Sequence, residues 1–196
     1  MDYPALMIVG QNPPTDPVRC MHGAWLLHYM SVTKGPHEEL VARLVTSLSL
    51  APMDVYATQA VKCPTLNNSQ PSREVGEHCR TKFLQRELQA VQPKVLLAFG
   101  VFAQDQVALC FDHAVCHPDE RDRAIQQGQD RGTAYHTFKL VSTAPTCRYY
   151  QVRTYANVIE APHPSVVGRF VTEESWLAGI QGARVFAETW RMPNVG

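Results

Sequence analysis

The chain has 196 residues, 45% of them hydrophobic, and its formal net charge at pH 7 is zero. This length favours a single globular domain over residues 1–196, and the balanced charge excludes an overall basic surface, so any binding of DNA must be local. No apolar run approaches the ~20 residues of a membrane helix, and the N-terminus does not resemble a signal peptide. We therefore expect a cytoplasmic protein without membrane contact, whose six cysteines are thiols or metal ligands rather than disulfides.

The first half of the chain alternates between strand and helix patterns. Residues 5–10 are apolar and end in glycine, which predicts a first strand. Residues 38–50 carry leucine at every fourth position and predict a helix, and residues 54–61 predict a second strand. A longer helix is expected over residues 72–91, with Ser72 as its N-cap. Its apolar side is expected to consist of Val75, Phe83, Leu84, Leu88 and Val91.

The middle of the chain contains a buried strand and then an excursion. Residues 94–100 are a continuous apolar run, which is typical of a strand buried on both faces, and residues 102–109 predict a short helix. Residues 110–155 form an enlarged excursion, which begins as a polar, irregular segment. Within it the segments HTFKLVST and YYQVRTY are compatible with a hairpin around Ala144-Pro145.

The chain closes with one more strand and one more helix. Residues 158–161 predict a last buried strand, and residues 172–191 predict a helix with one apolar face. That face is expected to carry Trp176, Ile180, Ala183, Ala187 and Trp190. Strands alternating with helices predict an α/β fold, a three-layer α/β/α sandwich around a mainly parallel four-stranded sheet.

Unusual polar residues follow three of the predicted strands. Gln11-Asn12 ends the first, Thr58-Gln59 the second, and His163 follows the last. One interpretation is ordinary loop chemistry, because Asn-Pro and His-Pro-Ser occur in turns and caps. The other is a functional site, since in such sheets chemistry takes place outside the carboxyl ends of the strands. Three polar ends in one sheet favour the site.

Residues 56–79 read YATQAVKCPTLNNSQPSREVGEHC. This segment resembles YITNVVKCRPPxNRxPxxxExxxC, which is typical of the iron–sulfur-containing branch, family 4, of the uracil-DNA glycosylase superfamily. The residues in register are Lys62, Cys63, Asn68, Pro71 and Cys79. Gly10-Gln11-Asn12-Pro13 is similar to the first motif of that family, and His163-Pro164-Ser165 is similar to its second.

The resemblance implies a monofunctional DNA glycosylase, which flips a damaged or modified base out of the duplex and hydrolyses its N-glycosidic bond to leave an abasic site. His163 would donate to O2 of the leaving base, and Asn12 would orient the attacking water. Gly10 and Gln11 would line the base pocket. The implied partner is DNA, the expected state is a monomer, and the expected role is DNA repair or antiviral defence.

The resemblance also implies a DNA-facing set of residues. Arg169 and Lys62 would contact phosphates, and Val166 and Val167 would enter the base stack. The complete set is Lys62, Pro164, Ser165, Val166, Val167 and Arg169. The alternative for the two valines is that they belong to the core.

Gln59 departs from the family at the position that reads the base, where the family carries asparagine. Glutamine holds the same amide one methylene further out, so the substrate is expected to be a modified pyrimidine such as a C5-modified cytosine, or uracil. The alternative is that Gln59 points away because the strand register differs by one residue. The stacking aromatic of the family has no clear counterpart, and Met21 is a nearby candidate, as are His22 and Trp25.

Cys63 and Cys79 match two ligands of the family's [4Fe–4S] cluster. The other two ligands would have to come from Cys20, Cys110, Cys116 and Cys147. The alternative is that all six cysteines are buried thiols.

Two other functions compete with the glycosylase. The changes at Asn12 and Gln59 allow a catalytically weak or inactive DNA-binding protein that kept the fold. A small-molecule hydrolase is the third interpretation, but the chain lacks a Gly-x-Ser-x-Gly elbow and a glycine-rich phosphate loop.

Overall fold

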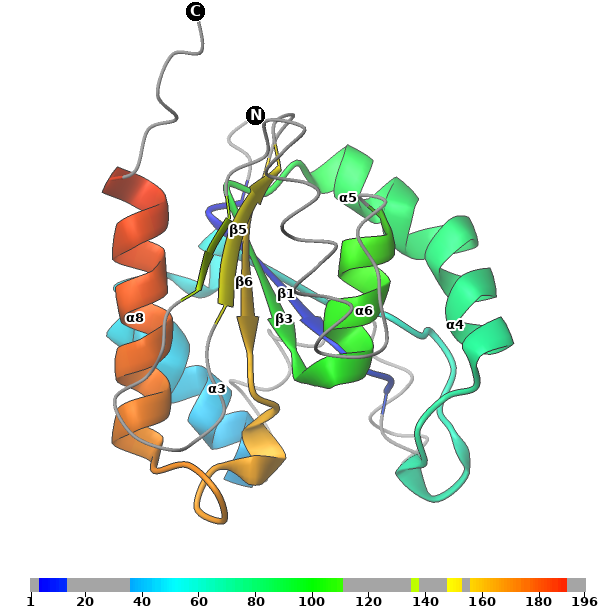
Figure 1. Cartoon of the computed structure of the whole chain (residues 1–196), viewed down its shortest axis with the longest axis horizontal. Helices are drawn as coiled ribbons and strands as arrows, with labels where there is room; N and C mark the ends of the chain where they lie inside the picture. Colours follow the sequence, from blue (N-terminus) through cyan, green and yellow to red (C-terminus); the bar gives the residue numbers. More distant parts are fainter. Residues whose placement is uncertain (1–3, 14–35, 111–134, 138–147, 153–155, 190–196) are drawn as a thin grey trace, which may run out of the picture.

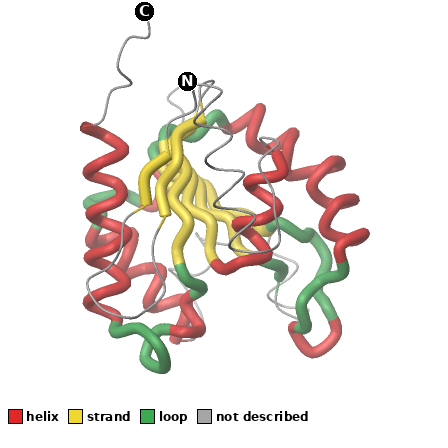
Figure 2. The backbone as a smooth tube through the Cα atoms, viewed as in Figure 1, coloured by secondary structure: helices red, strands yellow, loops and turns green. Residues whose placement is uncertain are grey.

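The computed structural model describes residues 4–13, 36–110, 135–137, 148–152 and 156–189. One sheet forms its centre, with the strand order β2-β1-β3-β6-β5-β4. Helices cover both faces of this sheet (Figures 1 and 2). The predicted three-layer α/β/α architecture is confirmed.

Four of the strands are parallel neighbours. They are β2 (Val55–Gln59), β1 (Leu6–Gly10), β3 (Val95–Phe99) and β6 (Ala156–Ala161). This parallel part matches the predicted four-stranded sheet. Two antiparallel strands, β5 (Arg148–Val152) and β4 (Tyr135–Thr137), extend the sheet beyond β6, because the expected hairpin joins the main sheet and makes it six-stranded.

Two helices cover one face of the sheet and a broken helical segment with α6 covers the other (Figure 1). The first face carries α3 (Pro36–Ser47) and α8 (Glu173–Thr189). The second carries α4 (Arg73–Cys79), the π-helical turn η3 (Arg80–Leu84), α5 (Gln85–Val91) and α6 (Gly100–Cys110). Three short 3₁₀ turns are η1 (Pro52–Asp54), η2 (Leu66–Asn68) and η4 (Pro164–Val166).

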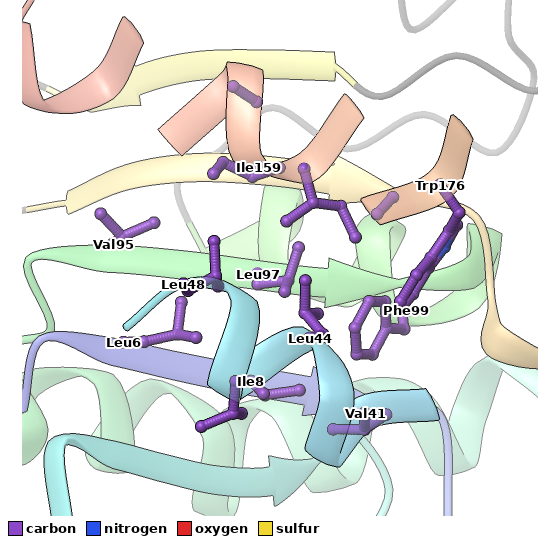
Figure 3. Close-up of a cluster of buried hydrophobic side chains, with 14 of the residues drawn as sticks. Leu6, Ile8, Val41, Leu44, Leu48, Val95, Leu97, Phe99, Ile159 and Trp176 are labelled. Atoms are coloured by element: carbon purple, nitrogen blue, oxygen red, sulfur yellow. The ribbon is translucent and has the colours of Figure 1, made fainter. Parts of the chain in front are cut away.

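The core is divided by the sheet into two layers. Every residue of β1 and β3 is buried, as the continuous apolar runs predicted. On the α3 and α8 face, Leu44 and Ile8 belong to the same buried cluster as Phe99 and Trp176, whose stacked rings have centroids 5.5 Å apart (Figure 3). Removing each such side chain from water contributes about 1.5–3 kcal/mol to folding. The predicted face of α8 is confirmed at Trp176, Ile180 and Ala183.

The helix predicted over residues 72–91 is correct in extent, and its apolar face is confirmed at Leu84, Leu88 and Val91. Ser72 is the N-cap, because its side chain accepts a hydrogen bond from the Val75 backbone N–H. Val75 and Phe83, however, are exposed. The residues buried on this segment are Gly76, Cys79, Leu84 and Leu88. The step from Cys79 to Leu84 is five residues, because the π-helical turn inserts one extra residue and shifts the buried side.

Several predictions fall outside the described residues. They concern most of the excursion, the turn at Ala144-Pro145, the side chain of Ala187 and the residues Cys20, Met21, His22, Trp25, Cys116, Cys147 and Trp190.

We expect two glycines to respond in opposite ways to a methyl group. Gly76 faces α6, where a Cβ would lie 2.8 Å from Phe102 Cζ, whereas a Cβ at Gly182 in α8 meets nothing within 4 Å. Gly76→Ala should therefore lower the free energy of unfolding by about 1–3 kcal/mol through overpacking. Gly182→Ala should raise it by about 0.5–1 kcal/mol through helix propensity. Urea denaturation measures both, and a neutral Gly76→Ala variant would contradict the packing described for α4 against α6.

Candidate active site

Three polar loops leave the carboxyl edge of the parallel strands. The loop after β1 carries Gln11-Asn12, β2 ends in Gln59, and the loop after β6 carries His163. Gly10 and Gln59 are partners in the β1–β2 ladder, and β3 lies between β1 and β6. Because these strands are parallel, their carboxyl ends and the predicted residues at those ends lie at one edge of the sheet.

Gln59 lies directly against Gly10. Its side chain is only 7% exposed, and a Cβ on Gly10 would overlap with Gln59 Oε1. A glycine is thus required at position 10 by the space that the amide occupies. Gln59 Oε1 is buried and accepts no hydrogen bond from the described residues. Leaving a buried acceptor unpaired costs about 1–3 kcal/mol, so this amide is suited to an external donor.

The Asn12 amide is fixed in place by its neighbours. Asn12 Nδ2 donates to Pro13 O at 3.1 Å and to Thr65 Oγ1 at 3.1 Å, while Asn12 Oδ1 accepts from Gln11 Nε2 at 2.9 Å. Thr65 Oγ1 in turn donates to Ser69 O at 2.5 Å. The loop after β1 is therefore tied to the loop after β2. Thr65 was missed from the sequence because a threonine in a Pro-Thr-Leu turn carries no signal of a partner 53 residues away.

The side chain of His163 turns back onto the residue two positions ahead. Its Nδ1 accepts from the backbone N–H of Ser165 at 3.1 Å and lies 2.8 Å from Ser165 Oγ. An amide N–H can only donate, so Nδ1 carries no proton and the neutral ring holds its proton on Nε2. The sequence could not define this tautomer, whereas the contact with Ser165 does. The imidazole is thereby set as a hydrogen-bond donor through Nε2.

The backbone before His163 is held by two helices, α6 and α8. Gln104 Nε2 of α6 donates to Ala161 O at 2.8 Å, and Trp176 Nε1 of α8 donates to Pro162 O at 2.9 Å. Gly100, the first residue of α6, has a φ of +78°, and a Cβ there would lie 3.1 Å from His163 Cβ. Position 100 therefore needs glycine both for its backbone angle and for the approach of His163.

The segment after His163 forms a compact turn. Pro164 is buried, Ser165, Val166 and Val167 are half-buried, and Arg169 is exposed. Val167 packs against the core, as the alternative interpretation of this residue required. Phe170 is 72% exposed, and its backbone N–H donates to Val166 O at 2.9 Å. Phe170 was missed from the sequence, where the Gly168-Arg169 turn before it was the available signal.

The ammonium group of Lys62 makes three hydrogen bonds within the protein. Its Nζ donates to Thr58 Oγ1 at 2.5 Å, to Gln59 O at 2.8 Å and to Glu87 Oε2 at 2.6 Å. Thr58 Oγ1 also donates to Glu87 Oε2 at 2.9 Å. All three N–H groups of the ammonium are thus directed at protein oxygens. Burial and then the charge of Glu87 raise the pKa of the neighbouring Tyr56 phenol above its usual value.

The described cysteines do not by themselves form the ligand set of a [4Fe–4S] cluster. Cys63 is exposed, Cys79 is buried, and Cys110 Sγ donates to Gln106 O at 3.2 Å. Burial raises the pKa of the Cys110 thiol to about 12, which disfavours the thiolate that binds metal. In the part of the chain that the structure describes, no group of three or more His, Cys, Asp or Glu side chains is placed to hold a metal.

Among the described helices, none combines the length and the apolar character needed to cross a membrane.

Comparison with known proteins identifies the family. A family model described as the uracil DNA glycosylase superfamily matches residues 2–191, so this chain belongs to that superfamily. It is also similar to the type-4 uracil-DNA glycosylase of Archaeoglobus fulgidus, with 35% identity over 78 residues. That match covers 40% of this chain and 39% of the relative. The expected resemblance to this superfamily and to its type-4 members is confirmed.

The contact between His163 and Ser165 predicts the chemical state of the ring. In ¹⁵N NMR of the wild-type protein near neutral pH, Nδ1 should show the shift of an unprotonated nitrogen and Nε2 that of a protonated one. Ser165→Ala should keep the backbone N–H contact and therefore the same tautomer. A protonated Nδ1 in the neutral ring would contradict the arrangement described here.

Proposed function

We propose that this protein is a monofunctional DNA glycosylase, which removes a modified pyrimidine, such as a C5-modified cytosine, or uracil. The observation that carries the proposal is the buried Oε1 of Gln59, which has no hydrogen-bond partner among the described residues and packs on Gly10. It lies at the same sheet edge as a histidine whose tautomer directs a donor from Nε2. Membership of the uracil DNA glycosylase superfamily supports the reaction class.

In the proposed reaction the target nucleotide is extruded from the duplex and its base enters the edge of the sheet. The bond from C1′ to the base nitrogen breaks, and its electron pair stays with the base. His163 Nε2–H donates to O2, where the negative charge develops. A water oxygen bonds to C1′, and the proton that this water loses neutralises the base anion. The products are the free base and an abasic site.

Asn12 orients the water in this proposal and does not take its proton, because an amide is not a base. Its Nδ2 is committed to Pro13 and Thr65, and its Oδ1 accepts from Gln11. A carbonyl oxygen has two lone pairs, so Oδ1 retains one for a water molecule. The rigid loop supports placement of that water, and the absence of a carboxylate at this position favours modest turnover.

Gln59 reads the base edge in this proposal. Its amide offers one acceptor and two donors, which complement either a cytosine-like or a uracil-like edge. The extra methylene relative to asparagine brings the amide further into the pocket, which favours a base held further out by a substituent. Gly10 and Gln11 form the floor beside it, since Gly10 is in contact with the amide.

The loop after His163 faces DNA in this proposal. Phe170 is the most exposed apolar side chain of this loop and is suited to fill the gap left by the extruded base. Arg169 is exposed beside it and is suited to a phosphate. Pro164, Ser165 and Val166 shape the turn that presents them, and the half-buried Val167 anchors it.

A catalytically inactive DNA-binding protein is the second candidate. It is favoured by one observation, that each polar atom of the Asn12 amide already has a partner within two neighbouring loops. The two candidates differ in whether modified duplexes acquire alkali-sensitive strand breaks after incubation with the protein.

His163→Ala should lower the rate of base release by about a hundredfold or more, because one oxyanion donor is worth roughly 2.7–4 kcal/mol. Single-turnover assays, with mass spectrometry of the released base, measure this change. Binding to a duplex that already contains an abasic site should change much less. Phe170→Ala serves as the converse control and should weaken that binding. Near-normal turnover of His163→Ala would show that the catalytic residue has been misplaced.

Gln59→Asn should move activity from a C5-modified cytosine toward uracil, because the shorter arm restores room for the smaller base. The wild-type protein should act poorly on uracil in duplex DNA, since a mismatched buried group costs about 1–3 kcal/mol. Competition between duplexes carrying one uracil or one C5-hydroxymethylcytosine measures the ratio of kcat/KM values. Efficient release of uracil by the wild type, unchanged or reduced in Gln59→Asn, would overturn this assignment of the substrate.

A further inference from the structure

We propose that Lys62, Glu87 and Thr58 form a clamp that positions Gln59 and so determines base selectivity. Lys62 is then a positioning residue and not a contact to a DNA phosphate. This inference rests on the proposed function of Gln59 as the group that reads the base.

The clamp is a closed set of short contacts between β2 and α5. Lys62 Nζ lies 2.6 Å from Glu87 Oε2, and both reach Thr58 Oγ1. The side chains of Lys62 and Glu87 are 22% and 25% exposed, and Thr58 is buried. Partly buried pairs are screened by salt much less than surface pairs. The charge of Lys62 is therefore neutralised within the protein, which leaves little of it for a phosphate.

The third contact of Lys62 connects the clamp to the base-reading residue. Lys62 Nζ donates to the backbone oxygen of Gln59 at 2.8 Å. The backbone N–H of the next residue, Ala60, donates to Gly10 O at 2.8 Å and so faces β1. The Gln59 carbonyl and the Ala60 N–H belong to one trans peptide group and point in opposite directions, so the Gln59 carbonyl points away from β1. In the described sheet β2 is an edge strand, and Lys62 supplies the partner that a neighbouring strand would otherwise give.

Thr58 and Gln59 point to opposite faces of β2. Thr58 points toward α5, where the clamp lies, and Gln59 packs on Gly10 on the opposite face. Fixing the side chain at position 58 and the carbonyl at position 59 leaves the backbone of Gln59 little freedom to rotate. The contacts on the α5 face of the sheet consequently determine how far the Gln59 amide extends toward the substrate. If substrates are distinguished by how far the Gln59 amide extends, its backbone must be held in place, because small shifts would admit the wrong substrate.

The clamp and a phosphate contact predict different outcomes for Lys62→Met. If Lys62 positions Gln59, the selectivity between duplexes with one uracil or one C5-hydroxymethylcytosine should fall by roughly tenfold, as in Gln59→Ala. The double variant Lys62→Met/Gln59→Ala should lose no more selectivity than either single variant, because both substitutions act through the Gln59 amide. The salt dependence of binding to an abasic duplex should stay unchanged. If selectivity is retained and the salt slope falls by about one, Lys62 contacts a phosphate and the clamp is overturned.

Matched variants keep the test decisive if Lys62→Met is unstable. Thr58→Val removes the hydroxyl at nearly constant volume and should reduce selectivity, whereas Thr58→Ser should retain it. Lys82→Met removes an exposed lysine from the same side of the protein and should change neither readout. Equal selectivity of Thr58→Val and Thr58→Ser would overturn the proposal.

A readout without activity separates this inference from the proposed function. The side-chain NH₂ signals of Gln59 in ¹⁵N NMR should be sharp in the wild type and shifted or broadened in Lys62→Met and Thr58→Val. If no DNA is processed but these signals respond, the proposed function fails and the clamp stands. If the signals do not respond, the clamp is overturned whatever the activity.

Discussion

The candidate site depends most directly on one steric contact, that between the Gln59 amide and Gly10. A side chain of any size at position 10 would occupy the volume of Gln59 Oε1. The two residues are register partners in β1 and β2, so the contact exists only if these strands pair as they do. A shift by one residue would turn Gln59 to the opposite face of the sheet and remove it from the site. The parallel pairing of two short strands therefore decides whether Gln59 is placed for its proposed role of reading the base.

The remaining groups of the site are brought to the same edge by helices that cover the sheet. Trp176 stacks on Phe99 in the core and also donates to Pro162 O, so one side chain links the packing of α8 to the loop that holds His163. Gln104 holds the same loop from α6 on the other face. His163 is thus located by both outer layers of the fold. This arrangement suits the proposed role of His163, because a donor to a developing charge must be fixed before the reaction.

The helices and strands were predicted well from the sequence, because long apolar runs and regular spacing of apolar residues follow directly from burial. The sequence predicted the three polar strand ends for the same reason, since each lies where a strict pattern stops. It failed where the pattern was broken by an irregular backbone. The π-helical turn after Cys79 adds a residue, so Val75 and Phe83 satisfied a helical period in sequence but lie exposed. The antiparallel extension of the sheet was likewise hidden, because strand partners are not encoded in the period of a single strand.

The partners of the site residues were the least predictable feature. The resemblance to the family implied a phosphate contact for Lys62. In the structure, Lys62 Nζ lies 2.6 Å from Glu87 Oε2, which is 25 residues away on α5. The π-helical turn has a consequence for this pair, because one extra residue rotates the following helix by about 100°. That rotation turns Leu84 and Leu88 into the core and, three residues after Leu84, carries Glu87 to the end of β2. A local irregularity in a helix is therefore connected, through Lys62, to the strand end that carries Gln59.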